Sequence, residues 1–314
     1  AGAWIETIKE WLDANEYSYS PATISLYNNY LKNHYQPYFN NLKLDQLTEI
    51  HITKFRNYLL GKMKPSSARR CLSALKKMLA DALKDKSPAK GVKAPQPNDP
   101  DVEAPTPEDF AKIYSIVKGS YYELPTLIAG WMGYRRGEVL ALRINDLDFE
   151  TNRIRVDEAW TKTKDGAYVI KAPKSKNGYR NEVAPGVLME KLKEHVKKLR
   201  SGKVVPLRDD TTLLFNMRPD TFSTCFRRFL MRRNGPDYSF HELRHFHATW
   251  MFENDFPDLY AAKRMGQTLQ VLKETYQHLG LKRETELDEK VAEIENTILH
   301  QIESIEKPLI QNER

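Results

Sequence analysis

The sequence predicts a mainly α-helical protein with a small β-sheet in an α+β second domain. Three observations support this prediction. Apolar residues recur at helical spacing over residues 4–90, a proline-rich stretch at 95–107 interrupts them, and residues 150–185 alternate in the manner of strands. Because 314 residues favour two domains over one, we expect a helical domain followed by a mixed one.

The first ninety residues predict a compact bundle of four or five short helices. Ser20 and Pro21 are typical of a helix start, since serine caps free backbone N–H groups and proline suits the first helical position. Further helices are expected after Thr48 and from Pro65 onward. The core candidates lie at helical spacing: Trp4, Ile5, Ile8, Trp11, Leu12, Ile24, Tyr27, Tyr30, Leu31, Ile52, Phe55, Leu59, Leu60, Leu72, Leu75, Leu79 and Leu83.

The second part of the chain mixes both patterns. Thr106 and Pro107 predict a capped helix start, and an apolar helix is expected to end near Trp131. Between 150 and 185 the alternation predicts short strands. Asn177-Gly178 predicts a two-residue hairpin turn, with Lys174 near its tip, because these residues tolerate the backbone that such turns need. Helices return from Gly186.

The residues from 284 onward predict one acidic amphipathic helix, whose apolar face carries Leu287, Val291, Ile294, Ile298, Ile302 and Ile305. Such a helix must cover its apolar face, either on its own domain or on a neighbouring protomer. We therefore expect four regions: a helical domain at 1–94, a linker at 95–107, a mixed α+β domain at 108–283 and a C-terminal amphipathic helix at 284–314.

The net charge of +7 is unevenly distributed, with +7 in residues 1–98, +4 in 99–280 and −4 in 281–314. A basic front and middle suit a polyanion such as nucleic acid. No apolar run is long enough to predict a membrane span, and the first residues lack a signal-peptide pattern. Cys71 and Cys225 lack metal-ligand spacing and favour a reduced cytosolic protein; the segment with His241, His245 and His247 also lacks a zinc pattern.

Two arginines and a histidine form a candidate phosphate site. His241 and Arg244 lie three residues apart, so they share a helical face. Arginine suits phosphate because its planar fork matches two oxygens and keeps its charge. Arg135 is the second candidate, between two glycines that permit a sharp turn. Arg136 competes with it, and a surface arginine paired with Glu138 is the ordinary alternative.

A nucleophile and an acid are also needed. Tyr276 is a candidate nucleophile, although residue type alone does not select it from 16 tyrosines. Lys174 is a candidate acid for a leaving oxygen. Lys171 and Lys176 compete with it, and a lysine in such a turn is commonly just solvated. Together the candidates predict covalent chemistry on a phosphodiester.

The segments that carry these candidates resemble, in their order, the tyrosine recombinases, the lambda-integrase family. Each segment alone is a weak signal; the order, after a basic helical domain, makes a specific match. It is closest to integrases of temperate phages and conjugative transposons of Gram-positive bacteria. The matching segments are Gly133-Tyr134-Arg135-Arg136-Gly137-Glu138-Val139-Leu140-Ala141-Leu142, His241-Glu242-Leu243-Arg244-His245, Met265-Gly266-Gln267 and Tyr276-Gln277-His278.

The resemblance implies that Arg135 and Arg244 clamp the scissile phosphate and that Glu138 steadies the site. One position departs from the family pattern. The family usually has His or Trp after a Leu-Gly pair, whereas this chain has Gln267 after Met265-Gly266. An amide can donate a hydrogen bond to a phosphate oxygen but cannot carry a proton, so we expect a supporting role for Gln267.

The resemblance also implies a cofactor-free and metal-free reaction. Tyr276 would attack the phosphate to form a 3′-phosphotyrosyl bond, and Lys174, followed by Ser175 where the family has Thr, would protonate the leaving 5′ oxygen. His241 would donate a hydrogen bond and carry a proton. Two such rounds through a Holliday junction would integrate or excise a mobile element.

The resemblance implies a core-binding DNA-binding domain at 1–94 and a catalytic domain at 108–283, which hold double-stranded DNA as a C-shaped clamp. It also implies three further copies in a homo-tetramer, with the helix at 284–314 making the protomer contacts. An excisionase and a host DNA-bending protein are also implied, in the bacterial cytoplasm, with no membrane. A type IB topoisomerase and a non-catalytic DNA-binding regulator are the alternatives. Integrases of this type usually carry an N-terminal arm-binding domain, and nothing before Trp4 matches it. We expect either a simpler protein without that domain or a truncated chain, and the missing initiator Met favours truncation.

Overall fold

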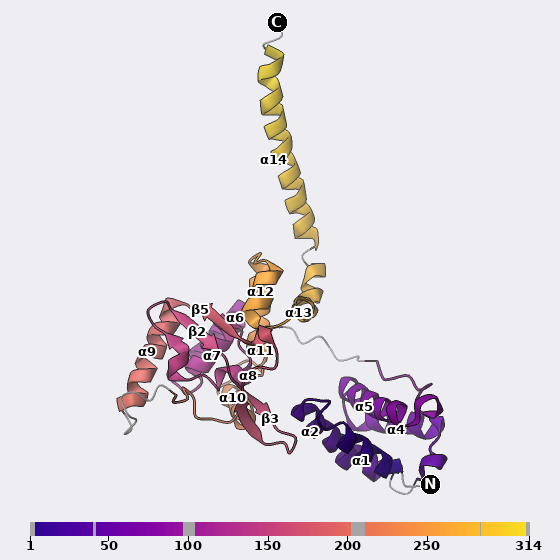
Figure 1. Cartoon of the computed structure of the whole chain (residues 1–314). Helices are drawn as coiled ribbons and strands as arrows, with labels where there is room; N and C mark the ends of the chain where they lie inside the picture. The colour runs from indigo at the N-terminus through magenta and orange to yellow at the C-terminus, as the bar shows by residue number, and fades with distance from the viewer. Residues whose placement is uncertain (1–3, 40–41, 97–103, 202–210, 283, 312–314) are drawn as a thin grey trace. The chain divides into compact units, whose positions relative to one another are not determined.

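The computed structural model describes residues 4–39, 42–96, 104–201, 211–282 and 284–311. Within these ranges, the side chains of Leu44, residues 276–285, Leu287 and residues 302–311 lie outside the description. The chain divides into two compact units, each described by itself below. Unit 1 comprises residues 1–103 and 160–171, and unit 2 comprises residues 104–159 and 172–314. Mostly helical secondary structure with small antiparallel sheets confirms the predicted fold class (Figure 1).

Unit 1 is a helical bundle with one strand pair. Its helices are α1 (Trp4–Ala14), α2 (Pro21–Tyr30), a π-helical turn (Leu31–Tyr35), α3 (Gln36–Phe39), α4 (Glu49–Lys62) and α5 (Pro65–Leu83), with short 3-10 turns at Leu44–Gln46 and Lys84–Lys86. The Ser20 side chain accepts a hydrogen bond from the Thr23 backbone N–H, which confirms the predicted start of α2.

The core of unit 1 is rich in aromatic side chains. The indole Nε1–H of Trp4 donates to the Phe39 carbonyl (3.1 Å), and the Tyr35 hydroxyl donates to the Cys71 carbonyl (2.7 Å). Most predicted core residues are buried, and Ile5, Tyr27 and Leu83 are partly buried against the same core. Leu60 is 41% exposed, so its assignment to the core was wrong. Leu60 follows the buried Leu59 directly, and adjacent helical residues point in different directions.

A strand pair of β3 (Ala159–Lys162) and β4 (Tyr168–Lys171) completes unit 1. Its turn contains Gly166 in the left-handed region (φ +82°), which glycine adopts at little cost. Lys164 in this turn bonds the carboxylate of Glu16, which follows α1. The chain segment just before the Lys174 loop therefore groups with the N-terminal bundle.

Unit 2 combines helices with a three-stranded antiparallel sheet (Figure 1). The sheet has the order β1 (Leu147–Asp148), β2 (Arg153–Val156) and β5 (Arg180–Val183), with 3-10 turns at Ile144–Asp146 and Lys176–Gly178. The helices are α6 (Pro107–Val117), α7 (Glu123–Met132), α8 (Arg136–Val139), α9 (Gly186–Ser201), α10 (Pro219–Met231), α11 (Glu242–Glu253), α12 (Asp258–Met265), α13 (Leu269–Lys282) and α14 (Glu284–Gln311).

The predicted Asn177-Gly178 hairpin is wrong. Residues 176–178 form a 3-10 turn, and β5 pairs with β2 instead of folding back on residues 171–176. The favoured hairpin turn needs positive φ at both central residues, and neither Asn177 nor Gly178 has it. Gly178 serves close packing, because a Cβ there would lie 2.3 Å from Pro173 Cβ.

Candidate active site

Arg135 lies at the end of a tight turn between α7 and α8. Gly133 ends α7 in the left-handed region (φ +67°), as glycine commonly does at helix ends. A Cβ on Gly133 would lie 2.6 Å from His247 Cδ2, so this close approach also requires glycine. The turn fixes the Arg135 backbone as the cap of α8.

A buried carboxylate holds Arg135 in place. Glu138 is 4% exposed, and its Oε2 accepts from the Arg135 backbone N–H (2.8 Å) while its Oε1 accepts from Arg135 Nη1 (2.9 Å). Arg135 Nη2 donates to the Gly266 carbonyl (3.1 Å). Arg136 instead donates to the Ser223 hydroxyl on α10 (2.7 Å), so the two neighbouring arginines point to different partners.

Arg244 lies one turn into α11 and is 4% exposed. Its Nη1 donates to the Gly133 carbonyl and its Nη2 donates to Gln267 Oε1 (2.6 Å). Burial, and after it the charge of Arg135, lower the pKa of Arg244 to about 9, yet the guanidinium remains a cation at neutral pH. The structure therefore brings Arg135, Arg244, Glu138 and Gln267 together.

His241 caps the N-terminal end of α11 and is an exposed residue. Its ring lies 4.9 Å from that of His245. Partial desolvation, followed by the charges of His245 and Arg244, lowers the pKa of His241 to about 4. In the free protein its imidazole is therefore neutral at pH 7 and can accept a proton.

Tyr276 lies on α13, and its side chain is outside the described residues. Leu272, one turn earlier, is fully buried in a cluster formed with α11 and α12. Because residues four apart share a helical face, the Tyr276 backbone lies on the same side of α13 as Leu272. That side faces the two helices that carry Arg244 and lead into Gln267.

Lys174 is exposed in the bend before the 176–178 turn, and it has no hydrogen bond or ion pair with the described part of the chain. Its competitors Lys171 and Lys176 are exposed as well. The structure therefore places Lys174 on the loop between β4 and β5 without fixing its ammonium group.

Arg180 is a site residue that the sequence reasoning missed. Its side chain is 2% exposed, and its Nη2 donates to Glu138 Oε2 (2.6 Å). The signal was weak, because Arg180 is one charged residue beside a predicted turn. Only its pairing with Glu138, 42 residues earlier, reveals its position in the cluster.

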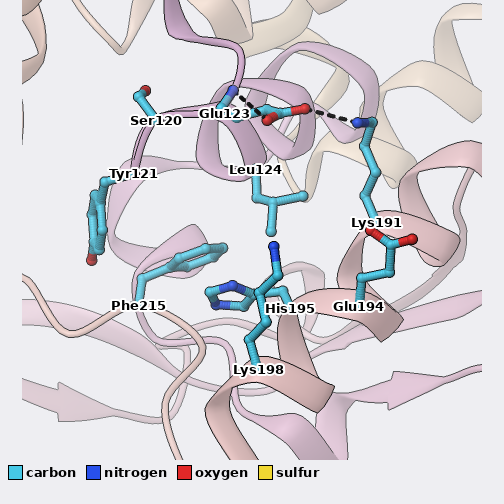
Figure 2. A pocket seen from close by; sticks show the side chains of 10 residues that line it. Ser120, Tyr121, Glu123, Leu124, Lys191, Glu194, His195, Lys198 and Phe215 are labelled. Carbon is cyan, nitrogen blue, oxygen red and sulfur yellow. Dashed lines mark hydrogen bonds and ion pairs between the residues drawn. The ribbon is translucent and has the colours of Figure 1, made fainter. Parts of the chain in front are cut away.

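A separate cavity of about 440 Å³ lies between α7 and α9 (Figure 2). Lys191 Nζ donates to Glu123 Oε1 (2.9 Å), and the Gly119 N–H donates to Glu123 Oε2 (2.7 Å), as the dashed lines show. The cavity shares no lining residue with the arginine cluster. We therefore do not place the reaction there.

Two absences concern the described residues alone. Across the described ranges, no three His, Cys, Asp or Glu side chains are grouped so that they could hold a metal ion. In the same ranges, no helix is both long and apolar enough to cross a bilayer.

Comparison with known proteins assigns the chain to the tyrosine site-specific recombinases. The phage integrase family matches residues 106–281, and the phage integrase N-terminal SAM-like domain matches residues 6–60. The chain belongs to the phage integrase family. This confirms the resemblance that its motifs predicted.

The relatives are integrases and recombinases. The tyrosine recombinase XerC-like protein of Caldanaerobacter subterraneus is 27% identical over 305 residues, which cover 85% of this chain and 77% of that protein. The ICEBs1 integrase of Bacillus subtilis is 24% identical over 279 residues, covering 84% and 76%. The topoisomerase-like and regulator alternatives are therefore not favoured.

Solved structures share the fold. The Tn1549 transposon integrase in complex with transposon right end DNA has a TM-score of 0.76 at 15% identity, covering 93% of this chain and 100% of that one. A lambda integrase tetramer bound to a Holliday junction has a TM-score of 0.57 at 19% identity, covering 83% and 74%.

Proposed function

We propose that this chain is the integrase of a mobile element and that it cuts and rejoins double-stranded DNA through a covalent tyrosine intermediate. The observation that carries the proposal is the pair of half-exposed Arg135 and buried Arg244, which Glu138 and Gln267 hold by hydrogen bonds. Two guanidinium groups can bind the non-bridging oxygens of one phosphate and stabilise the charge that develops there.

The proposed reaction exchanges one phosphoester bond for another. The Tyr276 oxygen bonds to phosphorus, the bond from phosphorus to the 5′ oxygen breaks, and Lys174 protonates that oxygen. Neutral His241 accepts the tyrosine proton, which fits its lowered pKa. Because the 3′-phosphotyrosyl ester keeps the bond, a 5′-hydroxyl from a second DNA strand can reverse the step. No metal or cofactor enters this scheme.

A covalent-adduct assay tests the proposal. The protein is incubated with a nicked suicide substrate carrying its attachment site, and a denaturant-stable adduct is resolved on a gel. We expect an adduct with wild type and none with Tyr276→Phe. Tyr179→Phe is the control, because it removes the same hydroxyl group from an exposed tyrosine that adjoins the 176–178 turn. Loss of the adduct in Tyr179→Phe but not in Tyr276→Phe would refute the assignment.

We also propose that four copies assemble on two DNA sites and that α14 links them. Val291, Ile294 and Ile298 on α14 are each at least half exposed in the single chain. Unit 2 also has an apolar groove of about 520 Å³ on α7, α11 and α12, lined by exposed Trp250 and Tyr260 among others. Both surfaces would be covered if α14 of one copy packed into the groove of the next.

The assembly is tested by the size of the protein–DNA complex. Ile298→Glu should reduce tetramers to smaller complexes, since it places a charge on the apolar face. His300→Glu adds the same side chain on the opposite face and should leave the tetramer intact. Equal complexes for both variants would contradict the role of α14.

The remaining parts of the proposal concern partners and location. Unit 1, which is basic, and unit 2 would hold the duplex as a clamp, and residues 95–107 would be the linker of that clamp. An excisionase and a host DNA-bending protein would set the direction of recombination in the bacterial cytoplasm. These partners follow from the family and are tested by adding each to the recombination assay.

A further inference from the structure

Arg180 is a buried cation that contacts three separate parts of unit 2. It is the first residue of β5, two residues after the 176–178 turn. Its guanidinium lies 5.0 Å from the centre of the Tyr134 ring, donates to both oxygens of Glu138 (2.6 and 3.3 Å) and donates to the Gly178 carbonyl (3.2 Å). One side chain therefore joins α8 to the loop that carries Lys174.

The third contact is with the turn before Gln267. Gly266 has a left-handed backbone (φ +61°), and a Cβ there would lie 1.9 Å from Arg180 Nη1 and 2.8 Å from the Asn177 carbonyl oxygen. The Gly266 carbonyl also accepts from Arg135 Nη2 (3.1 Å). The Lys174 loop, Arg180 and Arg135 therefore all meet at one glycine.

We infer that Arg180 is a positioning residue that fixes the Lys174 loop relative to the Arg135 and Glu138 pair. The inference rests on the proposed function, in which Lys174 is the general acid. Within the loop, the hydrogen bonds are short-range: the Gly178 N–H donates to the Ser175 carbonyl and the Tyr179 N–H to the Lys176 carbonyl. These bonds shape the turn but do not tie it to the phosphate site.

A guanidinium fits this position better than an ammonium. Arg180 bonds both Glu138 oxygens and Gly178 at once, and its Cζ lies over the Tyr134 ring, 5.0 Å from the ring centre. A lysine is a point charge on a flexible chain and can replace only part of this geometry. We therefore expect Arg180→Lys to keep the charge and lose part of the positioning.

The consequence is selective loss of leaving-group protonation. A misplacement of about 1 Å can cost about 100-fold in rate, because the acid must reach the departing oxygen in the transition state. Without Arg180, the Lys174 loop loses the hydrogen bonds that connect it to Glu138 and, through Glu138, to Arg135. A leaving group that needs no proton would be insensitive to that loss.

The experiment compares two suicide substrates, a normal phosphodiester and one with sulfur in place of the 5′ bridging oxygen. With sulfur the bond from phosphorus to sulfur breaks and a thiolate departs unprotonated, since thiols ionise near pH 8.5, far below alcohols. Lys174→Ala, Arg180→Met and Arg180→Lys are measured on both. Arg153→Met is the matched control, because Arg153 donates to the β5 backbone at Asn181 (2.8 Å) and not to Glu138.

We expect Lys174→Ala and Arg180→Met to slow phosphodiester cleavage about 100-fold and to come within about tenfold of wild type on the sulfur substrate. Arg180→Lys should lie between, and Arg153→Met should match wild type on both. The ratio of the two rates does not depend on the folded fraction. If Arg180→Met cleaves both substrates equally slowly, the Arg180→Lys variant is the deciding measurement. The inference is overturned if the sulfur substrate does not restore the cleavage rate of Arg180→Lys either.

Two further outcomes separate this inference from the proposed function. If wild type forms no adduct with either substrate, the proposed recombinase activity itself fails. If sulfur restores Lys174→Ala but neither Arg180 variant, the activity stands and Arg180 does not act through Lys174.

Discussion

Replacing Glu138 with glutamine keeps the size of the side chain and removes the negative charge that Arg135 and Arg180 share. Removing one partner of a buried ion pair costs about 3–5 kcal/mol, because the remaining charge is left without compensation. Arg135 has a side chain 42% exposed, so water can solvate it, whereas the side chain of Arg180 is 2% exposed. We therefore assign the cost to Arg180 and expect the free energy of unfolding of unit 2 to fall by about 3–5 kcal/mol.

Urea unfolding measures this loss. With a denaturant dependence of about 3 kcal/mol per molar, the midpoint of the unit 2 transition should fall by about 1–2 M. Glu190→Gln on the exposed side of α9 is the matched control and should change stability by less than about 0.5 kcal/mol. If both variants unfold at the same urea concentration, the buried carboxylate does not stabilise the cluster.

The same pair of proteins predicts a pH dependence. Burial alone would raise the pKa of Glu138, but the charges of Arg180, Arg135 and Arg244 outweigh it and lower the pKa below its usual value. The stability from Glu138 is therefore fully present above its unfolded pKa of about 4.3 and is lost as pH falls through the lower folded value. The difference between wild type and Glu138→Gln should shrink below about pH 4; a constant difference there would contradict the ion-pair account.

Three further predictions concern single side chains. Gly133→Ala should destabilise unit 2 by about 2–4 kcal/mol, from left-handed strain and the clash with His247, measured by urea unfolding; a neutral effect would contradict the close contact. Gln267→Ala should slow adduct formation about 10–100-fold through one lost hydrogen bond, while Gln270→Ala on α13 should not; abolished cleavage would disprove the supporting role. In a plot of kcat/KM against pH, the acid limb that reports His241 should have its midpoint near pH 4. A midpoint near pH 6.5 that disappears in His241→Gln would show that the lowered pKa assigned to His241 is wrong.

Local rules in the sequence predicted most helices correctly. Ser20 with Pro21 and Thr106 with Pro107 mark helix starts whose side-chain caps the structure confirms. These signals depend on a few neighbouring residues, and caps act through nearby backbone groups. Helix boundaries of this kind can therefore be derived without tertiary information.

The loop around Asn177 shows where local rules fail. Asn-Gly favours a hairpin, but β5 pairs with β2, and Gly178 packs against Pro173 instead. Strand pairing is decided by tertiary packing, which outweighs the preference of two turn residues. The same limit explains why Arg180 was missed, since its partner Glu138 is near it in space and distant in sequence.

The arginine cluster around Glu138 could promote cleavage through its net positive charge or through the exact placement of its side chains, and the two explanations predict opposite effects of Glu138→Gln. Arg135, Arg180 and Arg244 surround one carboxylate, Glu138, so these four side chains carry an excess of two positive charges that a bound phosphate would offset. Glu138→Gln raises the excess and Arg180→Met lowers it. If charge alone controlled the reaction, the glutamine variant would bind DNA more tightly and cleave faster than wild type, and the methionine variant would do the reverse.

Position predicts that both variants cleave slowly on a phosphodiester, because each releases a contact that orients Arg135 or the Lys174 loop. DNA affinity measured over a range of salt concentrations separates the two effects, since phosphate neutralisation sets the salt slope and geometry sets the cleavage rate. Slow cleavage by Glu138→Gln at undiminished affinity would show that the carboxylate acts by holding the arginines in place. Faster cleavage by that variant would show that the cluster acts through its charge.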